Sequence, residues 1–261
     1  MSALVRLERQ DAIAVVTLCK PEKRNAFCPE MRRTLTAILN DQMIDRETRA
    51  IVLTGADGNF CAGADLSRVD PMAPRPTAME IRHNMREVHM LIRTLFTGPK
   101  PVIAAVEGLA YGGGFSIALA CDWIVAAKTA RFGTAFARLG LIGDMGINYT
   151  LMARIGLVAA RRMIALGTQA DGDEAVRTGI ADELADSGKA LSTALVAAQR
   201  YADAAPLTTA YTKAAYGNGI GTLEDALRAE LDYLPMAVES SDFQEALIAF
   251  KEKRPPIFNG K

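Results

Sequence analysis

Apolar residues along this chain form two kinds of segment: short continuous runs, and longer stretches in which they recur at helical spacing. The continuous runs predict buried strands at residues 12–19, 49–55 and 102–106. Further strands are expected at residues 3–8, 122–127 and 181–186. The helically spaced stretches predict helices, at residues 29–44, 78–96, 115–122, 146–155, 158–167, 172–178 and from Ser192 onward. The run at 12–19 is apolar at successive positions, so we expect both faces of that strand to be buried.

Strands and helices alternate over roughly the first 190 residues, and only helices are expected after them. This order predicts an α/β core over residues 1–191 and a helical region over residues 192–261. Two places share one shape, because the buried strands at 51–55 and 102–106 are each followed by a glycine-bearing turn. We therefore expect a core of similar turns stacked on one another. The proline-rich segment 67–77 is expected to be an exposed loop, and ARFG at 130–133 is interpreted as a turn.

The stretch most suggestive of chemistry is PVIAAVEGLAYGGGFS at 101–116, a strand followed by three glycines and the start of a helix. Such a turn leaves backbone N–H groups without intrahelical partners, and these groups can bind an anion or a developing oxyanion. The alternative is a glycine turn that only permits tight packing. The spacing matches neither the dinucleotide-binding fingerprint nor a Walker loop.

Charge and composition narrow the possible partners. The 261 residues contain 30 basic and 30 acidic side chains, so nothing points to nucleic acid or to an anionic membrane surface. The four cysteines form no C-x-x-C pair, which predicts reduced thiols in a cytoplasmic protein and no metal site. The first residues do not resemble a signal peptide, and no apolar run approaches the ~20 residues that a membrane-spanning helix needs.

With these motifs in view, the chain resembles the enoyl-CoA hydratase/isomerase (crotonase) superfamily over essentially its whole length. Five stretches in family order carry the resemblance: KPEKRNAF (20–27), IVLTGADGNFCAGADL (51–66), PVIAAVEGLAYGGGFSIALACD (101–122), ARFGTAFARLGL (130–141) and FKEKRPP (250–256). The resemblance implies a spiral of ββα turns, an acyl-CoA thioester substrate, and no cofactor other than the CoA that the substrate carries. It also implies a C-terminal region that supports a homotrimer or a hexamer. Leu223, Leu227, Leu231 and Leu234 could form such contacts, or could pack only on their own subunit.

The resemblance places the catalytic backbone donors at Ala64, in CAGAD, and at Gly113, the middle glycine. Proton transfer next to a thioester builds negative charge on its carbonyl oxygen. Two fixed N–H donors would stabilise that enolate without reorganisation, and one such donor is worth ~100- to 1000-fold in rate in other enzymes.

The chain departs from the hydratases of this family at both catalytic glutamates, whose positions hold Ser116 and Phe136. One acid remains nearby, Asp144 in the apolar segment LIGDMG, where desolvation would raise its pKa and suit it to act as a base. The alternative is that Asp144 is the N-cap of the helix that follows. Because one acid can both remove and return a proton, the pattern favours double-bond isomerisation over hydration, which also needs a positioned water.

Three other functions stay open: hydration by a lyase with Asp144 orienting the water, a dehalogenase-like activity, and acyl-CoA binding without chemistry. His89 and Asp144 fall where dehalogenases of the family carry a histidine and a nucleophilic aspartate, although the dehalogenase tryptophan is matched by Phe136. The alternative for His89, which is the more common one for a histidine on such a helix, is a partly exposed surface residue. By family position, the remaining contacts to the substrate are expected from Arg24, Ala26, Asp65, Leu66, Arg68, Phe136 and Lys253. Arg24, Arg68 and Lys253 would pair with CoA phosphates or remain solvated charges, and Asp65 is also a candidate for bonding local backbone groups.

Overall fold

The larger of two sheets organises the molecule, for which a computed structural model describes residues 3–217 and 219–261. Its strand order is β1-β2-β3-β4-β6-β9. The strands are β1 (Val5–Gln10), β2 (Ile13–Leu18), β3 (Ala50–Gly55), β4 (Val102–Val106), β6 (Trp123–Ala127) and β9 (Glu183–Ala185). Only β1 and β2 pair antiparallel, and all the other neighbours are parallel. The mixed α/β fold predicted from the sequence is thereby confirmed, and β2 is buried at every position, as expected.

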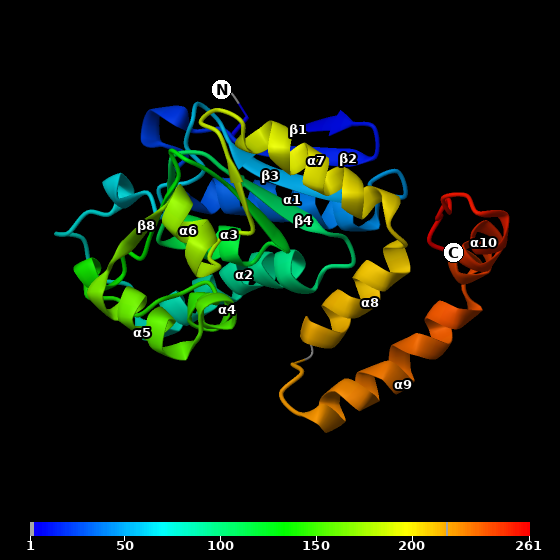
Figure 1. Cartoon of the computed structure of the whole chain (residues 1–261). Helices are drawn as coiled ribbons and strands as arrows, with labels where there is room; N and C mark the ends of the chain where they lie inside the picture. Colours follow the sequence, from blue (N-terminus) through cyan, green and yellow to red (C-terminus); the bar gives the residue numbers. More distant parts are fainter. Residues whose placement is uncertain (1–2, 218) are drawn as a thin grey trace.

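The two faces of this sheet carry separate cores, because successive side chains of a strand point to opposite faces. Ile51 and Leu53 of β3 belong to the core beneath α1 (Pro29–Ile44) and α2 (Ala78–Thr97). Val52 belongs to the core beneath α7 (Ala190–Asp203) on the other face. Figure 1 shows α7 lying along one face of the sheet and α1 along the other. Alanines supply the buried face of α7, which lets this helix approach the strands closely.

A second sheet was not predicted. It has the order β5-β7-β8, with β5 (Leu109–Tyr111) parallel to β7 (Arg131–Gly133), and β8 (Gln169–Asp171) antiparallel to β7. The interpretation of ARFG as a turn was therefore wrong, because its last three residues form β7. Strands of three residues are too short to show an alternating pattern, and tertiary pairing alone defines them.

Shorter helices connect the strands and complete the core around the glycine turn. They are α3 (Gly113–Leu119), α4 (Ile147–Ile155), α5 (Leu157–Leu166) and α6 (Gly172–Thr178), with 3-10 turns η1 (Pro21–Lys23), η2 (Leu66–Arg68) and η3 (Ala137–Leu139). Within the described part of the chain, no helix is both long and apolar enough to cross a lipid bilayer. All four cysteines are free, and Cys19 alone among them is not buried.

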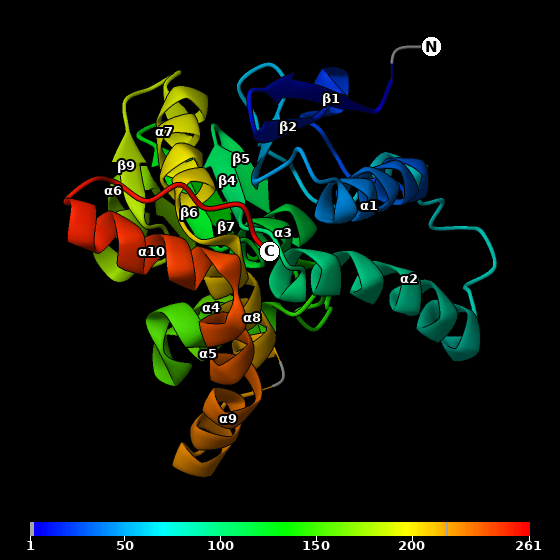
Figure 2. The same cartoon turned by 90° about the vertical axis from the view of Figure 1, so that its right-hand side faces the viewer.

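The C-terminal helices α8 (Pro206–Gly217), α9 (Leu223–Glu239) and α10 (Ser241–Glu252) extend away from the sheet, as Figures 1 and 2 show. A buried ion pair fixes the first of them, since Lys213 Nζ lies 2.5 Å from Asp122 and donates to two main-chain carbonyls. By contrast, α9 buries none of its residues. The division into residues 1–191 and 192–261 stays a prediction, and α7 crosses its boundary while packing on the sheet.

Candidate active site

The loops that follow β3 and β4 meet at one edge of the sheet, because the two strands are parallel neighbours. Backbone hydrogen bonds then hold the loops side by side. Cys61 N–H donates to the carbonyl of Leu109 (2.8 Å), and Tyr111 N–H donates to the carbonyl of Cys61 (3.0 Å). On its other side, the Cys61–Asp65 segment pairs with Phe27, whose N–H donates to the carbonyl of Gly63 (2.7 Å). Three chain segments that are distant in sequence are thus joined at the candidate site.

Glycine is required where these loops approach most closely. Gly63 has φ +87°, and a Cβ there would lie 2.7 Å from the carbonyl oxygen of Tyr111 and 3.6 Å from the amide nitrogen of Gly113. A Cβ on Gly114 would lie 2.3 Å from the carbonyl oxygen of Cys61. A side chain at either position would force the two loops apart. The glycines are therefore needed for packing, and the same packing brings Ala64 and Gly113 into one site.

The amides of Ala64 and Gly113 keep their hydrogen-bonding capacity. Gly112 N–H donates to the carbonyl of Gly133 (2.9 Å), and Ser116 N–H donates to that of Gly112 (3.0 Å). In residues 3–217 and 219–261, neither the N–H of Ala64 nor that of Gly113 donates a hydrogen bond. Gly113 opens α3, where the first N–H groups have no intrahelical partner.

A cavity of about 260 Å³ contains both residues. Its lining residues are Phe27, Cys28, Pro29, Arg32, Ala62, Gly63, Ala64, Leu66, Val88, Gly112, Gly113, Ala135, Phe136, Leu139, Leu141, Asp144 and Met145. Most of this lining is apolar, and Arg32 and Asp144 are its two charged side chains. The cavity therefore suits an apolar chain with a polar group held at one end.

Asp144 lies in the loop before α4, partly buried, and its Oδ1 is buried with no hydrogen-bond partner among the described residues. Burial raises the pKa of this carboxyl above its ordinary value, while a backbone hydrogen bond at Asp144 and the charge of His89 partly oppose the shift. The N-cap alternative was wrong: Gly146, with φ +80°, caps α4 without a side-chain hydrogen bond. The carboxylate is thus available to a ligand in the cavity.

Ser116 and Phe136, where the resemblance places the two hydratase glutamates, carry no acid. Ser116 is fully buried on α3, and its hydroxyl lies 3.2 Å from the carbonyl of Gly112 and 3.1 Å from that of Asp144. It thereby ties the glycine turn to the loop of the acid. Phe136 is 5% exposed and forms part of the cavity wall.

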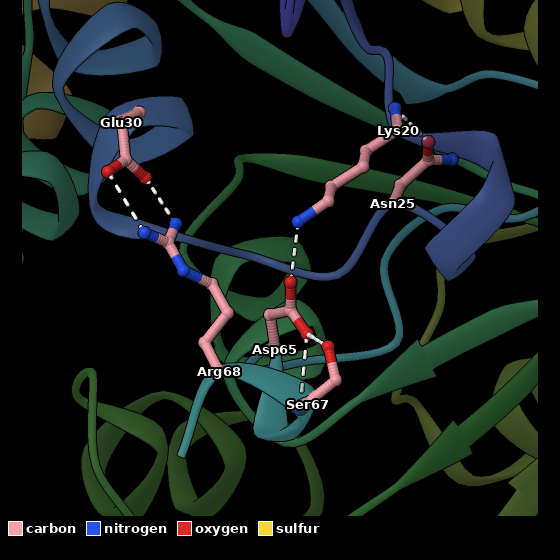
Figure 3. A network of polar contacts seen from close by, with 6 residues as sticks. All are labelled: Lys20, Asn25, Glu30, Asp65, Ser67 and Arg68. Atoms are coloured by element: carbon pink, nitrogen blue, oxygen red, sulfur yellow. Dashed lines mark hydrogen bonds and ion pairs between the residues drawn. The ribbon is translucent and has the colours of Figure 1, made fainter. Parts of the chain in front are cut away.

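Other expected substrate contacts are already paired within the chain, as Figure 3 shows. Asp65 forms an ion pair with Lys20 (2.5 Å) and accepts hydrogen bonds from the N–H and the hydroxyl of Ser67. The hydrogen bond from Lys20 is the main reason that the pKa of this carboxyl is lowered to about 2. Arg68 donates two hydrogen bonds to Glu30, of 2.5 and 3.2 Å. Asp65 thus bonds a local backbone group, as its alternative role required, and Arg68 is already paired with an acid although its side chain is 49% exposed.

The remaining expected contacts differ in burial and in whether they line the cavity. Leu66 lines it and is 52% exposed, while Ala26 is buried beside Phe27 and does not line it. Arg24 is exposed with φ +51°, and its carbonyl accepts a hydrogen bond from the N–H of Ala62. His89 is exposed on α2, outside the cavity lining but close enough to lower the pKa of Asp144. Lys253 ends α10 and lies outside the lining within this chain.

Two important residues were missed by sequence reasoning. Asn25 is fully buried at φ +56°, and its side chain bonds the main chain of Lys20, Ala56 and Asn59 (Figure 3 shows the bond to Lys20). Its left-handed backbone is common for asparagine, so the RN pair before AF was a usable signal of a turn. Arg32 lines the cavity, and nothing in the spacing of its helix distinguishes it from the exposed Arg33.

The described residues contain no group of three or more His, Cys, Asp or Glu side chains placed to hold a metal ion. Two unbonded N–H groups beside a desolvated acid form a site suited to a carbonyl compound that becomes an enolate.

Comparison with known proteins defines the family. The model of the enoyl-CoA hydratase/isomerase family matches residues 8–261. The chain is 36% identical to the 1,2-epoxyphenylacetyl-CoA isomerase of Escherichia coli, over 97% of each chain. It is 31% identical to the short-chain-enoyl-CoA hydratase of Clostridium acetobutylicum, over 96% of this chain and 95% of the relative. An enoyl-CoA hydratase structure from Bacillus anthracis superimposes with a TM-score of 0.91 at 29% identity, covering 99% of this chain and all of the other.

The chain belongs to the enoyl-CoA hydratase/isomerase family, and it is an enzyme of the crotonase fold.

Proposed function

We propose that this enzyme moves the double bond of an enoyl-CoA thioester, with Asp144 carrying the proton. One observation carries the proposal: within the described part of the chain, Asp144 is the only carboxylate that lines the cavity containing the two unbonded amides of Ala64 and Gly113. Its desolvation raises its pKa, which brings a carboxylate closer to the basicity that proton transfer near neutral pH requires. No cofactor beyond the CoA of the substrate enters this scheme.

The reaction begins with the thioester oxygen between the N–H groups of Ala64 and Gly113. In a 3-enoyl ester, the Asp144 carboxylate removes a proton from the α carbon, and the electron pair of that C–H bond moves into the enolate. The two amides stabilise the negative oxygen. The protonated Asp144 then returns its proton to the γ carbon, so that the double bond comes to lie between the α and β carbons and the Asp144 carboxylate is regenerated.

Hydration is the second candidate, because several relatives are named as hydratases, among them that of C. acetobutylicum. The site argues against it through Ser116 and Phe136. Neither residue can activate a water as a base, and the hydroxyl of Ser116 is already within hydrogen-bonding distance of two carbonyls. The E. coli relative, by contrast, is named as an isomerase.

The proposal is tested with Asp144→Asn on a panel of 3-enoyl- and dienoyl-CoA esters, followed by the absorbance of the conjugated product. Loss of a general acid–base typically costs 10²- to 10⁴-fold, and we expect kcat to fall within that range. The control His89→Gln tests the dehalogenase-like alternative and should retain most of the activity. Unchanged turnover by Asp144→Asn would remove Asp144 from the mechanism.

Reactions in ¹⁸O-labelled water separate isomerisation from hydration. Isomerisation leaves the acyl chain unlabelled, whereas hydration adds one labelled oxygen to it. Tight binding of acyl-CoA without turnover across the panel would instead support a binding protein.

We further propose that the enzyme assembles as a homotrimer or as a hexamer of two trimers through its C-terminal helices. Support comes from α9, on which Leu223, Leu231 and Leu234 are between 61% and 77% exposed. An apolar stripe of this kind is unusual on a monomer surface. Sedimentation equilibrium should give a trimer or hexamer mass, and Leu231→Glu should reduce it.

A further inference from the structure

Arg32 is the one charged residue of the cavity that the proposed reaction does not use. It comes from α1, and its side chain is only 11% exposed. Its Nη2 donates to a carboxylate oxygen of Glu87 on α2. Its Nε is buried and has no hydrogen-bond partner in the described part of the chain. Arg32 thus lines the cavity, with its Nη2 paired to Glu87 and its Nε without a partner.

A buried N–H donor of a charged group destabilises the folded protein unless a hydrogen-bond acceptor pairs with it. Guanidinium carries five N–H donors in a fixed plane and no acceptor, so Glu87 cannot satisfy them all. Buried polar atoms without partners are rare in folded proteins, and a missing ligand is one explanation. A purely hydrocarbon acyl chain offers nothing to this donor, which makes Arg32 a poor wall for such a chain.

The part of the substrate that meets Arg32 follows from the cavity. Arg32 lines the same space as Ala64 and Gly113, where the thioester is expected. The long pantetheine arm keeps the phosphates of CoA away from the thioester, so a phosphate is excluded from this space. The acyl group is then the part that can reach the guanidinium.

The local charges decide the chemistry of the acceptor. Glu87 already neutralises Arg32, and Asp144 adds a negative charge to the same cavity. A carboxylate on the acyl chain would face both acids and be repelled. An uncharged oxygen, as in a ketone, needs only the open N–H donor.

We propose that Arg32 is a specificity-determining residue that donates a hydrogen bond to an uncharged oxygen on the acyl group. The enzyme would then prefer oxygenated acyl-CoA esters to plain fatty acyl esters. The inference rests on the proposed function only for the position of the thioester.

Saturated esters test this preference without turnover. The set is hexanoyl-CoA, its 4-oxo and 5-oxo derivatives, and adipoyl-CoA, all with six-carbon acyl chains, and binding is measured by isothermal titration calorimetry. A hydrogen bond to a charged donor corresponds to roughly 10- to 100-fold in affinity. We expect at least one oxo ester to bind more tightly than hexanoyl-CoA by that factor, and adipoyl-CoA to bind no better than hexanoyl-CoA.

The variants assign the preference to the guanidinium. Arg32→Met should bind oxo and plain esters within about twofold of one another, because the donor is gone. Arg32→Lys keeps a positive charge opposite Glu87 but has no donor at the Nε position, so it should also lose the preference while staying folded. Arg33→Met, which removes the same charge from the exposed face of the same helix, should behave as the parent enzyme does.

Three results would overturn the inference: equal binding of all esters by the parent enzyme, a preference retained in Arg32→Met and Arg32→Lys, or adipoyl-CoA as the tightest ligand. The first would leave the Arg32–Glu87 pair as a link between two helices only. Failure of the proposed function looks different, since it would show an intact preference in calorimetry without any turnover of enoyl esters. Absence of binding by every ester would remove both proposals.

Discussion

Replacing Asp144 by asparagine should make the enzyme more stable while it removes the activity. The carboxylate is partly buried, and its Oδ1 meets no donor among the described residues. A buried polar atom without a partner costs about 1–3 kcal/mol, and an ionised one more than a neutral one. Asparagine keeps the shape but carries no charge, and its amide could stay partly unpaired. We therefore expect the free energy of unfolding to rise by about 1 kcal/mol at neutral pH.

The gain should depend on pH in a definite direction. Burial raises the pKa of Asp144 in the folded state above its ordinary value of 3.8, so the folded enzyme favours the protonated acid. Below that ordinary value the acid is protonated in both states, and the aspartate costs nothing through its charge. As the pH rises towards the raised folded-state pKa, the parent enzyme loses stability and the asparagine variant does not. The difference should grow over this window and then become constant.

Urea unfolding from pH 4 to pH 8 measures the effect. The protomer concentration is held fixed, because the apparent stability of an oligomer depends on it. Asp65→Asn is the matched control. Its carboxylate is paired with Lys20 and has a pKa of about 2, so that substitution should destabilise the enzyme at neutral pH. The stability that Asp65 contributes is lost as the pH falls from 3.8 through about 2. If Asp144→Asn is instead destabilising at neutral pH, the carboxylate has a structural partner and the reasoning fails.

Three further predictions concern other parts of the chain. A methyl group on Gly113 would lie 2.9 Å from Sδ of Met145 and would push the glycine turn out of place. Gly113→Ala should therefore lower kcat roughly 10- to 100-fold, because the amide donor is displaced from the thioester oxygen. An unchanged kcat would show that the thioester binds elsewhere. Lys213→Met leaves the largely buried Asp122, whose side chain is 21% exposed, without its ion-pair partner, and should cost about 3 kcal/mol in urea unfolding. A cost below about 1 kcal/mol would contradict a strongly desolvated pair. A thiol reagent at pH 8 should modify only Cys19 rapidly in the native enzyme and all four cysteines after unfolding. The other three thiols are buried, and burial raises the pKa of Cys61 to about 11 and that of Cys121 to about 12. Rapid modification of a second thiol in the native enzyme would contradict this.

The long elements could be predicted from sequence because their patterns repeat enough times to be distinct. The helix expected at 29–44 is found with those bounds, and that expected at 78–96 ends one residue later, at Thr97. The first strand was placed at 3–8 and runs from Val5 to Gln10, because its solvent-facing polar residues hide its end. The second sheet could not be predicted, since pairing between distant segments rather than any local pattern defines its strands.

At the site, sequence motifs located the loops but not the partners of their side chains. The positions of Ala64, Gly113 and Asp144 were predicted, and all three residues line one cavity. The pairing of Arg68 with Glu30, and of Arg32 with Glu87, joins elements whose approach depends on the complete fold. Chain order gives no measure of such distances. For the same reason, the cap alternative for Asp144 could be excluded only once the backbone at Gly146 was known.

The two kinds of functional group at this site depend on the fold in different ways. The N–H groups of Ala64 and Gly113 belong to loops that parallel strands and backbone hydrogen bonds hold together. Substitution of a neighbouring side chain leaves such donors in place, provided that the glycines needed for close packing remain. A catalytic acid, by contrast, is lost when its own residue is substituted, because its carboxyl group belongs to the side chain. In the proposed function, a chain with Ser116 and Phe136 therefore keeps the amides that would stabilise an enolate, and Asp144, on a different loop, would carry the proton.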